Sequence, residues 1–352
     1  MTHLLIAGGG PVGLAAAIEA RLAGMDATVV EPRAGVIDKA CGEGLMPGAL
    51  PALARLGVRP RGFELHGIQY RDGRRVVTHR FRVGTALGVR RLELHGALRD
   101  RAAELGVRVV EGRVEEVRQD GSGVRVSVSG PGAAGIGADG MIRADGMVAA
   151  DGLHSTVARL VGLDRGAPAA RRRYGQRRHY DLPPWTELIE VHWTSLGEIY
   201  ATPTASGGIG LSLLARQGVL FEDALAAAPE LAARVAGAAT LSELRGAGPF
   251  RQRRRARVAG RVLLVGDASG YIDALTAEGI RIGLAQAREA VAAFAADRPD
   301  AYEAAWRRVT REFRMLTAPL AALAASPAQP LIVPIARTAP FLFHAAVERL
   351  AR

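Results

Sequence analysis

Cysteine is almost absent from this chain of 352 residues, because Cys41 is the only one. An intrachain disulfide needs two cysteines, and the common structural zinc sites need several, so both are excluded. We therefore expect no metal site. A cytoplasmic location is the simplest interpretation of this cysteine usage.

Lysine is equally scarce. Lys39 is the only lysine among 46 basic residues, so the formal charge of +11 comes from arginines spread along the chain. The densest basic runs, at residues 171–178 and 251–257, match no nucleic-acid-binding module. We expect no nucleic-acid partner, and we interpret the arginines as solvated surface that helps to attract phosphate-bearing cofactors.

A long uninterrupted apolar stretch is also missing. The most apolar segment, residues 315–343, contains Arg337 and several prolines (Pro319, Pro327, Pro330, Pro334 and Pro340), which a membrane-spanning helix of about 20 residues does not carry. The N-terminus has no basic region followed by an apolar leader, which argues against secretion. Residues 302–352 have the spacing of an amphipathic helical tail that packs as a lid, and contact with a membrane surface is the lesser alternative.

The beginning of the chain has the pattern of a strand, a glycine-rich loop, a helix and a second strand. Residues 3–7 are apolar, Gly8, Gly10 and Gly13 follow, and residues 14–22 favour a helix. In such a loop the first glycine permits a tight turn, the second lets the backbone approach a pyrophosphate, and the third lets helix and strand pack together. Glu31 ends the second strand, where a carboxylate accepts hydrogen bonds from an adenosine ribose.

Two later fragments also follow short apolar runs that have the pattern of buried strands: Asp151-Gly152 and Gly266-Asp267. Ligands of open parallel sheets collect at the carboxyl ends of the strands. We therefore predict an α/β fold in which a discontinuous Rossmann-like domain carries an inserted β-sheet substrate domain and a C-terminal helical tail. The expected bounds are 1–61, 91–170 and 256–310 for the Rossmann-like domain, 62–90 and 171–255 for the insert, and 311–352 for the tail.

The order of these motifs resembles the superfamily of FAD-dependent monooxygenases and geranylgeranyl reductases, whose fold is that of the group A flavoprotein hydroxylases. The resemblance covers nearly the whole chain, to about residue 310, and implies noncovalently bound FAD. Gly8, Gly10, Gly13 and Glu31 would hold its ADP portion. Other positions implied to bind the cofactor are Lys39 and Arg91 at the phosphates, Val114 at the adenine, Asp267 at the ribityl chain, Ala277 and Gly279 at the flavin ring, and Gly42, Asp151 and Gly266 nearby.

The sequence departs from both branches of this superfamily. Gly270 and Ala274 replace a histidine and a proline typical of aromatic hydroxylases, whereas residues 39–45 look more like the reductases and halogenases. Ala277 stands where a glycine is usual. Residues 198–203, Glu-Ile-Tyr-Ala-Thr-Pro, retain little of the aromatic motif that lines a prenyl pocket in the reductases.

The loss of the prenyl motif, and a similarity to short bacterial flavin hydroxylases of polyketide pathways, favour oxygenation. The resemblance then implies hydroxylation of an aromatic or phenolic small molecule through a flavin C4a-hydroperoxide, with NAD(P)H as a transient reductant and O2 as oxidant. The alternatives are a flavin reductase that saturates C=C bonds of a prenyl or other lipophilic substrate, and a flavin-binding protein without turnover. Halogenases use a catalytic lysine on a separate motif, and here the only lysine matches a cofactor position.

Candidates for catalysis are few. Cys41 is either a small residue that lines the pocket or a group that acts on substrate or flavin. Tyr200 is the first choice within the insert because it falls in the segment equivalent to the prenyl motif. Other pocket candidates in the insert are His66, Tyr70, His179, Tyr180, His192 and Trp193. The sequence leaves the exact substrate, the choice between NADH and NADPH, and the oligomeric state open.

Overall fold

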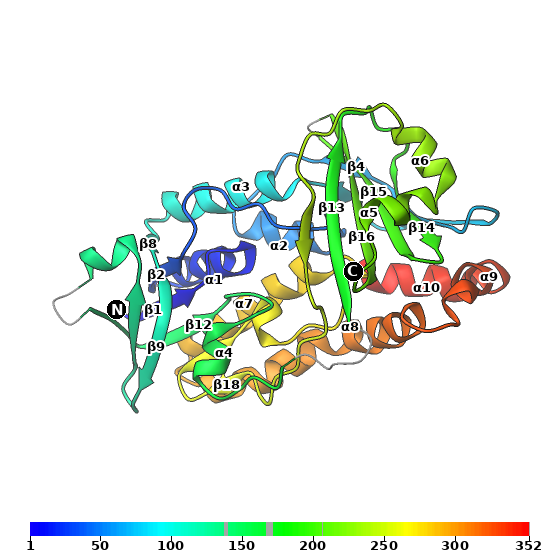
Figure 1. Ribbon diagram of the computed structural model, residues 1–352. Coiled ribbons are helices and arrows are strands. Elements are labelled where there is room, and N and C mark those ends of the chain that lie inside the picture. The colour runs from blue at the N-terminus through cyan, green and yellow to red at the C-terminus, as the bar shows by residue number, and fades with distance from the viewer. Residues whose placement is uncertain (137–139, 167–171, 206, 352) are drawn as a thin grey trace.

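The computed structural model describes residues 1–136, 140–166, 172–205 and 207–351. Two sheets stand at opposite ends of the molecule, and the long helix α8 (Tyr302–Ala324) runs beneath both of them (Figure 1). The predicted α/β fold with a helical C-terminal region is confirmed.

The first sheet has six strands in the order β18-β19-β12-β1-β2-β8. All neighbours are parallel except β18 and β19. Their bounds are Val258–Ala259 (β18), Val262–Leu264 (β19), Gly146–Ala149 (β12), His3–Ala7 (β1), Asp26–Glu31 (β2) and Arg108–Glu111 (β8). The sheet that begins at residue 3 is thus completed by a strand from the last third of the chain, as the discontinuous fold requires.

Both faces of this sheet are covered, which explains why its strands are nearly continuous apolar runs. Successive side chains point to opposite faces. Leu4 and Ile6 pack under α1 (Pro11–Leu22), α3 (Arg91–Glu104) and α7 (Gly279–Ala295). Leu5 and Ala7 face a three-stranded sheet of β9 (Arg113–Gln119), β10 (Val124–Ser129) and β11 (Met141–Ala144).

The second large sheet has seven strands in the order β17-β13-β16-β15-β14-β5-β6. Only the pair β14 and β5 is parallel. The bounds are Arg245–Ala247 (β17), Arg173–Tyr180 (β13), Gly208–Arg216 (β16), Gly197–Thr204 (β15), Leu188–Thr194 (β14), Gly67–Arg71 (β5) and Val76–Arg80 (β6). Two segments of the chain separated by the Rossmann-like core therefore build one sheet.

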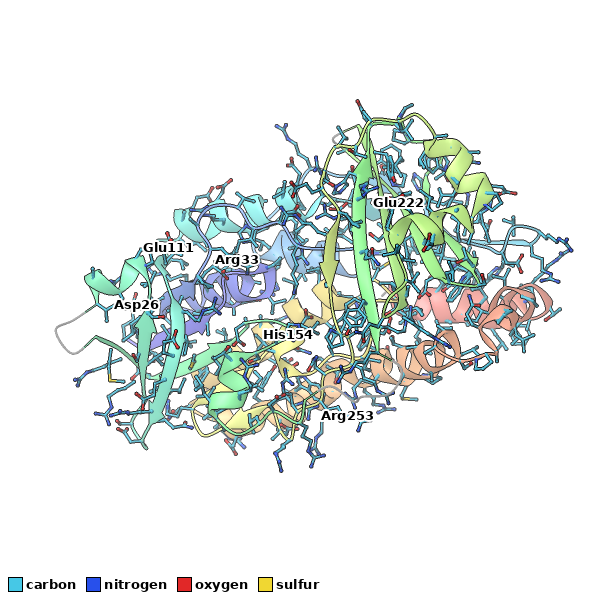
Figure 2. The ribbon with its side chains drawn as sticks, viewed as in Figure 1. Asp26, Arg33, Glu111, His154, Glu222 and Arg253 are labelled. Carbon is cyan, nitrogen blue, oxygen red and sulfur yellow. The ribbon has the colours of Figure 1, made fainter. Side chains whose placement is uncertain are left out.

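Helices cover this sheet on both faces. Ile199 and Leu213 pack with α5 (Phe221–Ala226) and α6 (Pro229–Val235), while Tyr200 and Leu214 share the opposite core with α9 (Ile332–Thr338) and α10 (Pro340–Ala351). On the α5 side Arg178 Nη1 pairs with Glu222 Oε1 at 2.5 Å, and Figure 2 labels Glu222 there. The remaining elements are β3 (Gly44–Leu45), β4 (Phe63–Leu65), β7 (Ala86–Gly88), α2 (Ala49–Arg55), α4 (Thr156–Leu160), η1 (Pro131–Gly135), η2 (Gly266–Ser269), η3 (Pro299–Ala301) and η4 (Gln329–Leu331).

The expectation that the arginine-rich runs are solvated surface is wrong for three of their members. Arg173, Arg177 and Arg254 are buried, each beside a carboxylate. Alternation along β13 turns every second side chain inward, and an ionised partner removes much of the cost of burying the charge.

One expected domain boundary cuts through a helix of the structure. The boundary at residues 310 and 311 falls inside the continuous helix α8, because the amphipathic pattern of that helix begins earlier. The boundary at residues 170 and 171 lies outside the described residues. The other bounds stay predictions.

Across the described parts of the chain, no single helix combines the length and the apolar character needed to cross a bilayer. Pro299–Ala324 and Gln329–Thr338 meet that criterion only when taken together, and they are bent by 117° relative to each other.

Candidate active site

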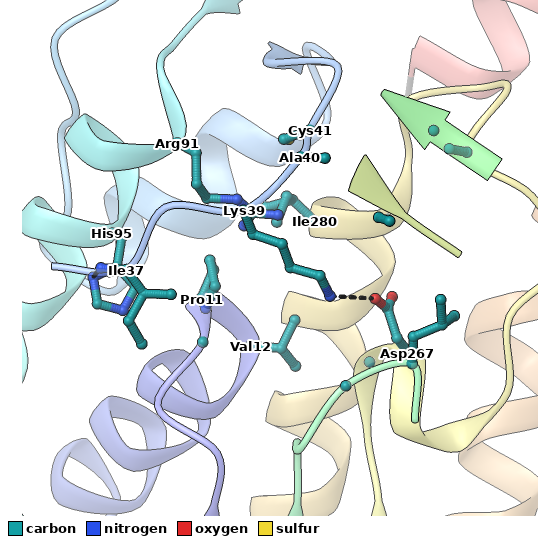
Figure 3. A pocket seen from close by; sticks show the side chains of 18 of the residues that line it. Pro11, Val12, Ile37, Lys39, Ala40, Cys41, Arg91, His95, Asp267 and Ile280 are labelled. Carbon is teal, nitrogen blue, oxygen red and sulfur yellow. Dashed lines mark hydrogen bonds and ion pairs between the residues drawn. The ribbon is translucent and has the colours of Figure 1, made fainter. Parts of the chain in front are cut away.

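A cavity of about 710 Å³ opens between the two large sheets. Its walls come from the carboxyl ends of β1, β2 and β12, from residues 39–45, from the start of α7 and from the seven-stranded sheet. This is the place where open parallel sheets bind ligands, and the volume is within the usual range of roughly 300–1,000 Å³ for small-molecule sites. Figure 3 shows the part of the cavity near α1 and α7.

The glycine-rich loop divides into packing positions and an open position. A methyl group on Gly13 would lie 1.8 Å from the carbonyl oxygen of Gly8, and one on Gly8, whose φ is +97°, would lie 2.5 Å from that of Ala150. A methyl group on Gly10 would meet no protein atom within 4 Å, although Gly10 caps the N-terminus of α1 and lines the cavity. Gly10 therefore leaves free space at the positive end of a helix, where a phosphate binds favourably.

Glu31 ends β2 beside this loop and is 4% exposed. Its Oε2 accepts a hydrogen bond from the backbone N–H of Gly9 at 2.8 Å, and Oε1 accepts one from Arg33 Nε at 2.7 Å. These bonds fix the carboxylate at the cavity wall, in the position where the ribose of a dinucleotide is held.

Basic side chains reach into the cavity from two elements. Arg91, on the first turn of α3, carries Nε and Nη1 atoms that are buried without a hydrogen-bond partner. Lys39 Nζ lies 3.8 Å from Asp267 Oδ2, and Figure 3 shows this pair spanning the cavity. Buried donors that lack partners cost stability unless a ligand satisfies them. The Arg91 guanidinium is thus suited to an anionic ligand.

The later motifs line the same cavity. Gly266 and Asp267 follow β19, and Asp151 follows β12. Asp151 Oδ2 accepts a hydrogen bond from the backbone N–H of Val157 at 2.9 Å, and burial raises the pKa of its carboxyl. Val114 lines the cavity at the start of β9, and Gly279 does so at the start of α7.

Ala277 adopts a left-handed backbone conformation that favours glycine. Its φ is +56° and it borders the cavity. An L-residue with a Cβ pays roughly 1–2 kcal/mol for this left-handed conformation. The loop thus holds local strain where it borders the cavity.

Residues 39–45 form one wall of the cavity, and Glu43 anchors them to the second sheet. Glu43 Oε2 accepts a hydrogen bond from His179 Nε2 at 2.6 Å, and Oε1 accepts one from the backbone N–H of Arg91 at 3.0 Å. Gly42 and Cys41 lie beside the cavity, and Cys41 Sγ accepts a weak hydrogen bond from the Glu43 backbone N–H at 3.4 Å. His179 therefore supports the wall from behind.

The end of the cavity at the seven-stranded sheet is largely apolar and aromatic. It is lined by Ile189, Tyr200, Leu214, Phe250 and Tyr271. Tyr200 donates a hydrogen bond from its hydroxyl to the carbonyl oxygen of Leu275 at 2.8 Å, and burial raises the pKa of that hydroxyl well above its usual value.

Among the candidates proposed in the insert, Tyr200 lines the cavity, whereas the others lie elsewhere. Tyr70 and Trp193 pack in the core behind Tyr200, Tyr180 packs with α5, and His192 is bonded to Glu190. His66 is not among the lining residues.

A buried charged cluster lies behind Tyr200. Arg173 pairs with Glu198, and Arg173 Nη1 is 3.5 Å from Asp273 Oδ2. Burial raises the pKa of Glu198 to about 7 and also raises that of Asp273, against the lowering effect of Arg173. One cation faces two carboxyls, so the cluster favours holding a proton.

Sequence reasoning missed several lining residues, among them Phe250, His95 and Tyr271. His95 Nε2 lies 2.8 Å from the carbonyl oxygen of Gly9, and burial lowers the pKa of its imidazole. The spacing of Arg91 and His95, four residues apart on one helix face, was the available signal. Tyr271, four residues after Asp267, gave no such signal because that segment has no regular period.

These features fit FAD. A helix N-terminus with open space before it, a fixed carboxylate at the neighbouring strand tip and an unpartnered guanidinium are the groups that hold a pyrophosphate-linked nucleotide. The same cavity continues to an aromatic end that suits a flat ring.

Comparisons with known proteins agree. A family model described as an FAD binding domain matches residues 1–177. The menaquinone reductase of Mycolicibacterium smegmatis is 35% identical over 129 residues, which are 34% of this chain and 31% of that protein. The similarity thus spans about a third of the length of that relative.

Solved structures share the fold over nearly the whole chain. A flavin-dependent brominase superposes with a TM-score of 0.82 at 19% identity, over 99% of this chain and 94% of that one. The p-nitrophenol 4-monooxygenase of Pseudomonas putida DLL-E4 superposes with a TM-score of 0.75 at 20% identity, over 99% of both chains. At such identities the likeness is one of fold.

Proposed function

The chain belongs to the FAD-binding domain family, and from this premise we propose that it is an FAD-dependent monooxygenase acting on a compact aromatic or phenolic molecule. The reaction consumes one O2 and the two electrons of NAD(P)H. One oxygen atom enters the substrate as a hydroxyl group and the other leaves as water. Bound FAD would supply the two-electron chemistry.

One observation carries this proposal: a single cavity joins the dinucleotide loop to the aromatic end. The cavity of about 710 Å³ would hold the cofactor along the loop end and the acceptor at the aromatic end. Phe250, Tyr271 and Tyr200 offer ring faces and edges against which an aromatic substrate packs.

The residues around the cavity would act by binding, orienting and excluding water. Glu31 and the loop at Gly10 hold the adenosine and phosphate portion, and Arg91 offers its free donors to the phosphates. Asp267 would hold the ribityl chain, and the backbone of residues 276–279 would hold the ring portion. Tyr200 keeps its phenolic proton at neutral pH because burial raises its pKa, and it positions the loop at Leu275.

Lys39 lies at the cofactor end, paired with Asp267. As it is the only lysine in the sequence, no lysine is left for the aromatic end. This argues against the lysine-dependent chemistry expected of a halogenase.

The second candidate is a flavin reductase of a lipophilic C=C bond. It is favoured by the similarity to a menaquinone reductase and by the apolar lining at Ile189 and Leu214. In that reaction the two electrons of NAD(P)H and two protons would be added across the double bond, and O2 would take no part.

The two functions separate in a paired assay on the FAD-loaded protein. NADH or NADPH oxidation is followed with a panel of phenols under ¹⁸O2, and the molecular masses of the products are measured by mass spectrometry. The same protein is incubated anaerobically with menaquinone and with a geranylgeranyl lipid. One ¹⁸O atom in a product supports the monooxygenase; an anaerobically saturated lipid without any labelled phenol product overturns it in favour of the reductase.

A further inference from the structure

Large apolar side chains point outward from the hairpin made by η4, α9 and the start of α10. Leu331, Ile335, Phe341 and Leu342 are 53%, 47%, 69% and 56% exposed. Single exposed apolar residues are ordinary, but several in one short segment mark an interaction surface. We call these four residues the hairpin tip.

The exposure of the tip does not arise from loose packing of the helices. Ile332, Val333 and Ala336 on the inner side of α9, and Phe343 and Val347 on the inner side of α10, are buried in the core of the second sheet. The helices are thus already anchored by their inner faces. The outer face is available for contact with something else.

The segment that carries the tip has charge of one sign. No acidic residue occurs between Glu312 and Glu348, while Arg314 and Arg337 lie within that stretch. The two flanking acids are engaged, because Glu312 Oε1 accepts a hydrogen bond from Arg349 and Glu348 Oε1 accepts one from the backbone N–H of Arg82, both at 2.7 Å. An apolar tip whose own segment carries Arg337 and no acidic residue complements an anionic lipid surface.

The tip is continuous with the wall of the cavity. Phe343 packs against Tyr70 with ring centroids 4.8 Å apart, and Tyr70 packs against Trp193 at 5.5 Å. Tyr200, which lines the aromatic end, belongs to the same core. As Figure 1 shows, α9 and α10 lie beside the seven-stranded sheet, away from the Rossmann-like end of the molecule.

We propose that the hairpin tip docks this protein on the surface of an anionic lipid bilayer, with Phe341 and Leu342 inserted among the headgroups and Arg337 paired with lipid phosphates. The docking is peripheral and leaves the fold unchanged. It brings the wall of the substrate end next to the lipid phase. The inference stands apart from the proposed reaction, because it concerns a surface and not the cavity.

Flotation with vesicles tests the proposal. The full-length, FAD-loaded protein is mixed with vesicles of phosphatidylcholine alone, or of phosphatidylcholine with about 30 mol% phosphatidylglycerol, which gives a strongly anionic surface. The bound fraction is measured after centrifugation through a density gradient. We expect binding to the anionic vesicles that weakens as salt is raised. Phe341→Ser with Leu342→Ser should lower the partition coefficient about tenfold or more, and Arg337→Gln should lower it about fivefold.

The matched control is Leu22→Ser with Leu220→Ser, which removes two exposed leucines, 47% and 63% accessible, from α1 and from the loop before α5. This variant should float like the wild type. Thermal melting and FAD content show that each variant is folded.

Three results would overturn the proposal. They are no flotation of the wild type with anionic vesicles, equal flotation of the Phe341/Leu342 variant and its control, and a lipid-free dimer in analytical ultracentrifugation that the Phe341/Leu342 variant dissociates. The last result would assign the tip to a second copy of the chain.

Discussion

Gly10 and Gly13 lie three residues apart in one loop, yet an added methyl group meets open cavity at the first and a backbone oxygen at the second. We predict that Gly10→Ala leaves the stability of the apoprotein within about 0.5 kcal/mol of the wild type and weakens FAD binding about tenfold, because the methyl group occupies ligand space. Gly13→Ala should destabilise the apoprotein by about 1–3 kcal/mol through overpacking. Chemical denaturation and fluorescence titration with FAD measure the two effects. Normal FAD affinity of Gly10→Ala would contradict the placement of the cofactor.

Glu198 should make stability depend on pH. Its pKa is about 7 in the folded protein against an ordinary value of 4.5, so the folded state holds the proton more tightly than the unfolded chain. This contribution to stability is complete below pH 4.5 and is lost as the pH rises through 7, and it amounts to about 3 kcal/mol.

Glu198→Gln removes this titration and keeps the shape of the side chain. The difference in unfolding free energy between the wild type and this variant should therefore slope downward from pH 4.5 to 7, as followed by urea denaturation. Glu187→Gln, at a glutamate that is 59% exposed, serves as the control. A difference that is flat across this range would contradict the assigned pKa.

A substitution of Cys41 distinguishes a residue that only lines the cavity from one that takes part in the reaction. Its Sγ accepts a hydrogen bond from the Glu43 backbone and borders the cavity. If it only lines the wall, Cys41→Ser should retain the full FAD content and change turnover by less than about threefold, since the replacement is nearly isosteric. Loss of turnover with FAD still bound would assign the thiol a chemical role.

At the scale of elements, the loop between η2 and α7 holds strain at one position. Ala277 has a φ of +56°, which glycine adopts freely. Ala277→Gly should stabilise the apoprotein by up to about 1 kcal/mol, because relief of roughly 1–2 kcal/mol outweighs the added chain entropy of the unfolded state. Ala274→Gly in the same loop, where Ala274 is not among the positive-φ residues, should instead destabilise. Urea midpoints of the two variants that move in the same direction would contradict this account.

The elements that could be predicted from sequence are those with one dominant pattern. β1, β12 and β19 are apolar runs with a glycine soon after their carboxyl ends, and β2 is an apolar run that ends at Glu31. A strand buried on both faces needs no other pattern. The strand β13 was not predicted, because its arginines have the pattern of a solvated surface. In the structure Arg173 and Arg177 are buried and form ion pairs. A partner such as Glu198 or Asp38 comes from another segment, so sequence spacing does not reveal it.

The site divides in the same way. The glycine loop and Glu31 are local motifs that follow one strand and one helix, so their positions could be predicted. The aromatic end is made by β13–β17, by the loop at Tyr271 and by Phe250, which meet only after the sheets assemble. Which aromatic residue faces the cavity depends on strand register, and sequence alone does not fix that register.

At the scale of the whole molecule, the cavity lies between the two sheets, so a ligand there touches both. FAD at 100 times its dissociation constant should stabilise the folded protein by about 2.7 kcal/mol, which raises the melting temperature by several degrees. Differential scanning calorimetry should show both sheets unfolding in one shifted transition. ADP, which reaches only the loop end, should give a smaller shift; an equal shift would contradict a ring-binding portion of the site.

The strand order of the first sheet affects how the protein can fold during its synthesis. β1 is the first strand to leave the ribosome, but its neighbour β12 and the next strand β19 emerge much later. Until residues 262–279 have been translated, the nascent chain lacks Asp267 and the start of α7, which form part of the cavity wall. Domains generally fold as units during synthesis, so this domain can fold only after about three quarters of the chain has been translated. Cofactor binding is therefore a late step in the maturation of the polypeptide.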